Sequence, residues 1–248
     1  RQYNDFVAEL ATHHQNTFVG LGACYPFAGD QMHREMERAV RDLGLRGFII
    51  SPTCADEFID SPKAFPFFEV CAELDAVVFV HNRDSCLACE HMQDHRLTEL
   101  VGRPNEMGLL AARLIFSGLM ERLPNLKLLL GRLGGSITLY AGRIQQGWET
   151  RHTRKDGPPW GSDNLTNSFM DSLCRIHVDT QTFHPPAITC AVETLGAERV
   201  LFGTDYPPVP RSRAASIEDV RNTALPGEQI AMILSGNASR LFKLPTEN

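Results

Sequence analysis

Six short apolar runs mark the chain, and within each run the hydrophobic residues are nearly continuous. Continuous apolar runs of this length are typical of parallel β-strands buried on both faces, whereas strands with one exposed face alternate. The runs are Phe18–Cys24, Gly47–Ile50, Val77–His81, Leu126–Gly131, Ile176–Thr180 and Val200–Asp205. We predict six parallel strands that neighbour one another in chain order.

Amphipathic segments between these runs indicate helices. In Met32–Leu43 the residues Met36, Val40 and Leu43 share one face, and Gly44 follows as a stop signal. The other helical segments are Ala64–Leu74, Met107–Leu123 and Pro186–Leu195. Strands that alternate with helices predict an α/β fold with a parallel sheet. No linker, repeat or low-complexity run divides residues 1–248, so we predict a single domain.

Composition narrows the class of protein. Of the 248 residues, 43% are hydrophobic and 22% are charged, which is typical of a globular protein and excludes a disordered chain. The net charge of −6 disfavours binding to nucleic acid or to an anionic membrane surface, because both need a basic excess. No run of eighteen apolar residues occurs, so we predict no membrane span.

The seven cysteines are odd in number, and several lie inside apolar runs. This pattern disfavours a disulfide framework and favours a reducing, cytoplasmic location. We predict that Cys24, Cys71 and Cys190 are buried and unpaired.

Polar residues follow several of the predicted strands. In parallel α/β folds, binding and catalytic groups gather where strands end and loops begin. His81 ends one run and Asp205 ends the last, while Arg132 follows Gly131. A single such residue is often structural, since a histidine can be satisfied by packing and an aspartate can cap a turn. On separate strands of one sheet, however, His81 and Asp205 predict a metal site.

Several segments, in order along the chain, resemble the amidohydrolase-related group, the branch of the amidohydrolase superfamily that contains aminocarboxymuconate-semialdehyde decarboxylase. These segments are Arg46–Thr53, Val78–Asn82, Leu100–Ile144, Glu193–Pro208 and Ile233–Leu244. The resemblance implies a (β/α)₈ TIM barrel with a divalent metal at the carboxyl ends of its strands, most often zinc, with manganese possible. It also implies decarboxylation, hydrolysis or hydration of a small carboxylated aromatic or ring-derived substrate, and a homodimer.

The resemblance assigns roles to particular residues. His81 matches the family's strand-five metal ligand, and Asp205 matches the strand-eight ligand, which also takes a proton as a catalytic residue. The family's strand-one His-x-His pair has no counterpart, because no such tripeptide occurs in this chain. We therefore expect the first two strands of the barrel to precede Arg1.

Arg132 occupies the position at which the family usually has a strand-six histidine. An arginine cannot act as a general base near neutral pH. It can grip a substrate carboxylate with two hydrogen bonds or stabilise a developing oxyanion. We predict that Arg132 points into the pocket beside His81 and Asp205, as a substrate-binding and catalytic group.

Further substrate-binding candidates lie next to these positions. Asn82 and Arg83 follow His81 directly, and His184 lies just past a strand end. For His184 two interpretations are equally good, since it either lines the site or caps the helix that starts at Pro185.

Cys86 and Cys89, with His91 and His95 nearby, have the spacing of a zinc knuckle. Short motifs of this kind often match by chance. We favour a loop that covers the substrate over a second zinc site.

Three functions remain open. The first is a metal-dependent lyase or hydrolase that acts on a small carboxylated substrate. The second is a metal-independent hydrolase of the lactonase type, in which arginine and histidine hold an acidic substrate; the replacement of the strand-six histidine by Arg132 favours it. The third is a catalytically inactive barrel that acts as a binding subunit. Metal content, activity after chelation and turnover of carboxylated compounds distinguish the three.

Overall fold

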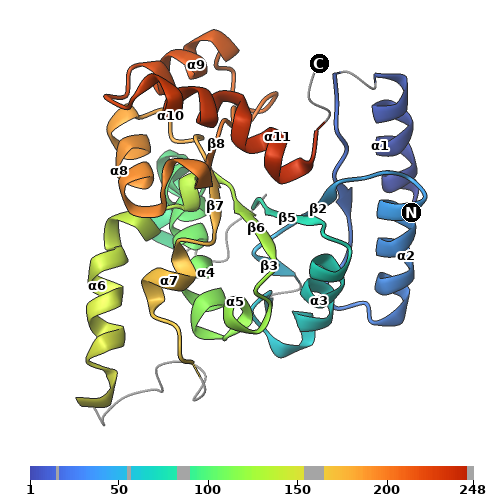
Figure 1. Cartoon of the computed structure of the whole chain (residues 1–248), viewed down its shortest axis with the longest axis horizontal. Helices are drawn as coiled ribbons and strands as arrows, with labels where there is room; N and C mark the ends of the chain where they lie inside the picture. Colours follow the sequence, from blue (N-terminus) through green and yellow to red (C-terminus); the bar gives the residue numbers. More distant parts are fainter. Residues whose placement is uncertain (15–16, 55–56, 83–89, 154–164, 245–248) are drawn as a thin grey trace.

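The computed structural model describes residues 1–14, 17–54, 57–82, 90–153 and 165–244. Six parallel strands form one sheet in the order β1-β2-β5-β6-β7-β8, which confirms the predicted order (Figure 1). The strands are β1 (Gly22–Ala23), β2 (Gly47–Ile50), β5 (Val77–Val80), β6 (Lys127–Leu130), β7 (His177–Asp179) and β8 (Val200–Leu201). Parallel strands in chain order, joined by helical connections, define the α/β barrel architecture that the sequence predicts.

Helices connect and cover these strands. They are α1 (Gln2–His13), α2 (Asp30–Arg41), α3 (Phe65–Glu73), α4 (Arg103–Phe116), α5 (Leu119–Arg122), α6 (Ile137–Glu149), α7 (Phe169–Leu173), α8 (Pro185–Leu195), α9 (Arg213–Arg221), α10 (Gly227–Ala231) and α11 (Asn237–Phe242). In Figure 1, α6 and α8 lie on the flank opposite α1 and α2.

Alternation along each strand separates two apolar faces. Phe48, Val78, Leu128 and Val178 belong to the main core, which the surrounding helices complete. Val77, Leu129 and Leu201 point to the other face and pack with Leu241 of α11. This pattern explains why the strands read as continuous apolar runs, since both of their faces are buried. β1 and β8 form the two edges of this sheet, and two further strands between them stay a prediction.

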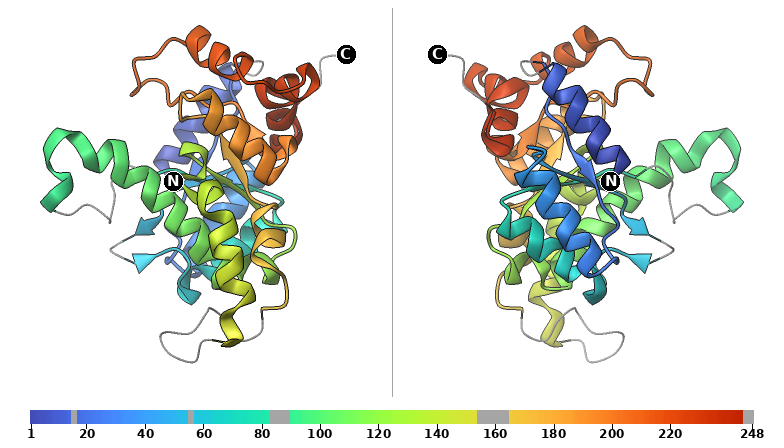
Figure 2. Two further views of the ribbon diagram at one scale, coloured as in Figure 1. Left: turned by 90° about the vertical axis from the view of Figure 1, so that its left-hand side faces the viewer. Right: turned by 90° about the vertical axis from the view of Figure 1, so that its right-hand side faces the viewer.

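The structure corrects one predicted helix. The segment Met107–Leu123 is divided between α4 and α5, and α4 begins earlier, at Arg103. The break falls at Gly118, whose φ of 83° lies in the left-handed region that a continuous helix excludes. A short antiparallel hairpin, β3 (Thr53–Cys54) with β4 (Glu57–Phe58), was not predicted. Figure 2 shows this hairpin and the segment leading into α4 projecting from the same side of the molecule.

Five cysteines lie within the described part of the chain, and all five are free. Cys71 is buried, as predicted, but Cys24 and Cys190 are only partly buried. Cys24 follows the edge strand β1, which has a neighbour on one side only, and Cys190 lies off the buried face of α8. Among the described residues, no helix has the length and hydropathy needed to cross a bilayer.

A candidate active site at the carboxyl ends of the strands

His81 and Asp205 meet at one edge of the sheet although their strands are not adjacent. His81 follows β5 directly, and Asp205 lies in the segment after β8, with β6 and β7 between them. The Nε2 of His81 lies 3.3 Å from Oδ1 of Asp205, and their side chains are 24% and 12% exposed. The predicted placement of both residues at the same rim is therefore confirmed, while their roles as metal ligands stay predictions.

The imidazole of His81 is held in its neutral form. Burial lowers its pKa below the usual value, and the cation of Arg132 lowers it further, while the carboxylate of Asp205 acts in the opposite direction. A neutral imidazole is the form that binds a metal ion. The side chain is therefore suited to coordinate a cation near neutral pH.

Arg132 points toward this pair, as predicted. Its Nη1 lies 3.8 Å from Oδ2 of Asp205, and its side chain is 11% exposed. Burial lowers the pKa of the guanidinium, and Asp205 opposes that effect. A guanidinium nevertheless keeps its charge in proteins. Arg132 thus places a fixed positive charge beside the Asp205 carboxylate.

Asn82 binds the guanidinium of Arg132 through a hydrogen bond. The Nε–H of Arg132 donates to Oδ1 of Asn82 over 2.9 Å. The amide of Asn82 donates in turn to the carbonyl oxygen of Arg103 over 2.9 Å and to Oε2 of Glu106 over 3.0 Å. Both Asn82 and Glu106 are fully buried. Because both N–H groups of Asn82 have protein partners, it supports Arg132, and its predicted contact with substrate stays a prediction.

Asp179 and Gln181 also belong to this site, although sequence reasoning did not single them out. Oδ1 of Asp179 accepts the backbone N–H groups of Leu133, over 3.1 Å, and Gln181, over 3.0 Å. Burial raises the pKa of Asp179 to about 6, against the lowering effect of these two hydrogen bonds. The side chain of Gln181 donates to Oδ2 of Asp205. The only signal available in the sequence was that Asp179 lies near the end of the run Ile176–Thr180.

These groups open onto a cavity of about 710 Å³. Its polar lining includes His81, Asn82, Glu99, Arg103, Arg132, Gln181 and Asp205, and its apolar lining includes Leu100, Pro104, Leu133, Phe183 and Val209. This volume is within the range of small-molecule sites, and few polar groups against apolar walls are typical of such sites. Two arginines within apolar walls are suited to a small, flat, anionic compound.

The remaining candidates fall outside this arrangement. His184 is exposed at the N-cap of α8 and is not among the residues that line the cavity, although its neighbour Phe183 is. Its role in substrate binding stays a prediction. Arg83, Cys86 and Cys89 lie outside the described residues. Arg103, which sequence reasoning did not single out, lines the cavity from the first turn of α4.

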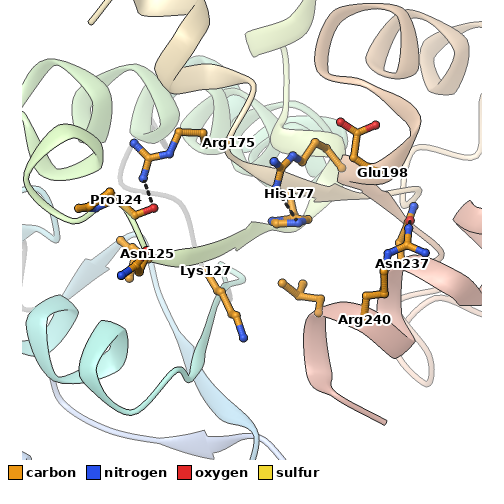
Figure 3. Close-up of a pocket in the computed structure, with 11 residues that line it drawn as sticks. Pro124, Asn125, Lys127, Arg175, His177, Glu198, Asn237 and Arg240 are labelled. Atoms are coloured by element: carbon orange, nitrogen blue, oxygen red, sulfur yellow. Dashed lines mark hydrogen bonds between the residues drawn. The ribbon is translucent and has the colours of Figure 1, made fainter. Parts of the chain in front are cut away.

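A second cavity, of about 360 Å³, lies near the amino ends of β6, β7 and β8 (Figure 3). It is rich in cations, and two of them, Arg175 and Lys127, have partners within the protein. Arg175 donates to the carbonyl oxygen of Pro124 over 2.8 Å, and the Nζ of Lys127 lies 2.6 Å from Oδ1 of Asp75. In barrels of this class the amino ends of the strands serve stability and the carboxyl ends carry chemistry. We therefore place the functional site at His81 and Asp205.

His81 and Asp205 supply two ligands of the types that zinc and other divalent metals accept. Within the part of the chain that the structure describes, no three histidine, cysteine, aspartate or glutamate side chains form a cluster able to hold an ion. His81 and Asp205 therefore fit two ligand positions of a metal site, and the described residues bring no third ligand of these types to them.

The structure is thus an α/β barrel that carries an imidazole, a carboxylate and a guanidinium at the carboxyl ends of its strands. Residues 1–244 match the model of the amidohydrolase family, and the chain belongs to that family. The chain is 30% identical to 2-amino-3-carboxymuconate-6-semialdehyde decarboxylase from Dictyostelium discoideum over 97% of its own residues. It spans 65% of that relative's length.

Two solved structures have the same fold. One is 5-carboxyvanillate decarboxylase from Sphingomonas paucimobilis, which is 27% identical, with a TM-score of 0.87 over 98% of this chain and 71% of that one. The other is dihydroxybenzoic acid decarboxylase from Polaromonas sp. JS666, solved with manganese and the inhibitor 2-nitroresorcinol. It is 25% identical, with a TM-score of 0.84 over 100% of this chain and 75% of that one.

Proposed function

We propose that this protein is a divalent-metal-dependent decarboxylase of a small carboxylated aromatic or ring-derived compound. The observation that carries the proposal is the convergence of His81, Asp205 and Arg132 on one cavity at the carboxyl ends of the strands. The relatives described above, which act on carboxylated compounds of this kind, support the choice of decarboxylation over hydrolysis and hydration.

His81 and Asp205 would hold the metal, through Nε2 and the carboxylate. The ion would supply positive charge that stabilises negative charge developing on a substrate oxygen. The family resemblance implies zinc, with manganese possible. The manganese bound by the Polaromonas enzyme favours manganese for this site as well, so we propose a divalent ion and test both.

Side chains of this protein would bind the substrate, transfer a proton and exclude water. Arg132 grips the substrate carboxylate, because its guanidinium is charged, largely buried and held by Asn82. Asp205 would also take up a proton from solvent at its carboxylate and pass it to the substrate. Delivery of that proton to the ring carbon, followed by cleavage of the bond to the carboxylate, releases CO₂ and returns the bonding electrons to the ring. The apolar lining around Leu133 and Phe183 excludes water from the ring face.

A second candidate is supported by one observation. Arg132 stands 3.8 Å from Asp205, and a cation so close to a metal ligand competes with a metal ion. A metal-independent hydrolase of the lactonase type, in which Arg132 and Arg103 hold an acidic substrate, accommodates this charge without conflict. Chelation separates the two candidates.

We further propose a homodimer in a reducing, cytoplasmic compartment. The free state of the described cysteines supports the compartment. An exposed apolar strip on α4 and α6, which includes Leu109, Leu139 and Tyr140, supports a contact with a second copy.

Release of CO₂ tests the proposed function. The protein is loaded with Mn²⁺ or with Zn²⁺ and offered 2,6-dihydroxybenzoate, 5-carboxyvanillate and 2-amino-3-carboxymuconate-6-semialdehyde. We expect turnover of at least one compound, its loss on exhaustive chelation, and its loss in His81→Ala but not in His184→Ala. CO₂ release that survives chelation contradicts the metal requirement, hydrolysis of a carboxylated lactone that survives chelation selects the hydrolase, and no CO₂ release with either metal overturns the proposal.

A further inference from the structure

Asp179 connects two loops that carry residues of the site. It ends β7, and its Oδ1 accepts the backbone N–H of Leu133 over 3.1 Å and that of Gln181 over 3.0 Å. Leu133 directly follows Arg132, and the side chain of Gln181 donates to Asp205. One carboxylate oxygen of Asp179 is therefore hydrogen-bonded both to the residue that follows Arg132 and to the residue that binds Asp205.

The turn that carries Arg132 needs such an anchor. Arg132 and Leu133 both have φ of 56°, in the left-handed region that side chains rarely adopt. Within the turn, Gly134 donates to the carbonyl oxygen of Gly131 over 3.0 Å, and Gly135 donates to that of Arg132 over 2.8 Å. The hydrogen bond from Leu133 to Asp179 ties this turn to β7.

Glycines allow the neighbouring loops to approach Asp179 closely. A Cβ atom on Gly203, which follows β8, would lie 2.9 Å from the Cβ of Asp179. A Cβ atom on Gly131, which follows β6, would lie 3.6 Å from Oδ2 of Asp179 and 3.2 Å from the ring of His81. Asp179 is thus enclosed on both sides, which leaves its carboxylate little freedom to move.

We propose that Asp179 is a positioning residue that fixes Arg132 and Asp205 relative to each other. It is 7% exposed and is not among the residues that line the cavity, so it acts through Leu133 and Gln181 and does not touch substrate. The kinetic consequence of this role rests on the proposed function, but the geometric role does not.

The Nε–H resonance of Arg132 in nuclear magnetic resonance spectra reports the geometric role directly. Asp179→Asn keeps an oxygen that can accept both backbone N–H groups, whereas Asp179→Ala removes it. Asp171→Ala is the matched control, because Asp171 also accepts a backbone N–H, from Ser168 at the start of α7, but lies outside the cavity.

We expect slow hydrogen exchange at the Arg132 Nε–H in the wild type, in Asp179→Asn and in Asp171→Ala. In Asp179→Ala exchange should be at least about tenfold faster, since an ordered guanidinium bond becomes a fluctuating one. Equal exchange in Asp179→Ala and Asp171→Ala overturns the proposal.

A measurement on the wild type covers the case in which Asp179→Ala does not fold. The backbone amides of Leu133 and Gln181 should exchange far more slowly than the amide of Tyr206, which is 79% exposed and donates to the Thr204 hydroxyl over 3.3 Å at the surface. Exchange at the rate of Tyr206 overturns the proposal. Failure of the proposed function would appear separately, as wild-type protein that turns over no substrate while these exchange rates hold.

Discussion

The Nε–H of Arg132 donates to Oδ1 of Asn82 over 2.9 Å, and this contact fixes a cation beside the carboxylate of Asp205. Asn82 is itself held by the buried Glu106, on α4. The orientation of the guanidinium is therefore set by the packed protein and not by solvent. A cation fixed in advance grips a carboxylate at a lower entropic cost than a mobile one.

Removal of the Asn82 amide should weaken binding of an acidic ligand. In Asn82→Ala, Arg132 loses its partner and the buried carboxylate of Glu106 loses a donor, which costs about 1–3 kcal/mol of unfolding free energy. We expect affinity for 2-nitroresorcinol, measured by calorimetry, to fall roughly tenfold, the equivalent of about 1.4 kcal/mol.

Asn237→Ala is the matched control for this measurement. Asn237 is also buried, and its amide donates to the carbonyl oxygens of Ala197, over 2.8 Å, and Val200, over 2.6 Å. Its loss should lower stability by a similar amount but leave ligand affinity unchanged. If both variants lose affinity equally, the effect is one of stability, and the supporting role of Asn82 is wrong.

Two substitutions of Arg132 should distinguish its effect on substrate binding from its effect on metal binding. Arg132→Gln removes the charge that grips the carboxylate, and we expect KM to rise roughly 10- to 100-fold, as for loss of a hydrogen bond to a charged group. Arg132→His restores the usual family residue and removes the fixed cation beside Asp205. It should raise metal occupancy or activity. Unchanged values of both in Arg132→His would mean that Arg132 is a structural residue only.

His177, the first residue of β7, should make the stability of the protein depend on pH. Burial, assisted by the cation of Arg199, lowers its pKa to about 4. As pH falls below about 6.5, the unfolded chain binds a proton at this residue while the folded chain does not. Unfolding free energy should therefore decrease between about pH 6.5 and 4, by up to roughly 3 kcal/mol.

Urea unfolding at several pH values measures this contribution. His177→Gln should lose the slope over that window, whereas His184→Gln, which changes an exposed histidine, should keep it. The same slope in the wild type and in His177→Gln would show that other groups control acid stability.

The hydrophobic pattern of the sequence predicted the strands, whose positions depend on local sequence. Strands buried on both faces are necessarily continuous in hydrophobicity, so Val77–Val80 and Lys127–Leu130 could be placed within a residue or two. The break at Gly118 was missed because the apolar period continues through it, and only the backbone angle shows the interruption.

Some residues of the site could likewise be predicted from the sequence, and others could not. His81, Arg132 and Asp205 lie at or shortly after the carboxyl ends of strands, so their meeting could be predicted from chain order alone. Asp179 accepts a backbone N–H from the loop after another strand, and the side chain of Gln181 donates to Asp205; no residue pattern encodes such bonds. Resemblance to a family supplied the metal and the reaction class, which periodicity and composition could not.

Binding of Mn²⁺, measured by calorimetric titration of the metal-free protein, tests the central claim most directly. His81 and Asp205 lie 3.3 Å apart and would both coordinate the ion, so each of His81→Ala and Asp205→Ala should lower Mn²⁺ affinity at least about tenfold. The control variant His184→Ala should bind like the wild type, with one ion per chain. Equal Mn²⁺ affinity in all four proteins, or no binding by the wild type, would contradict a metal site at His81 and Asp205.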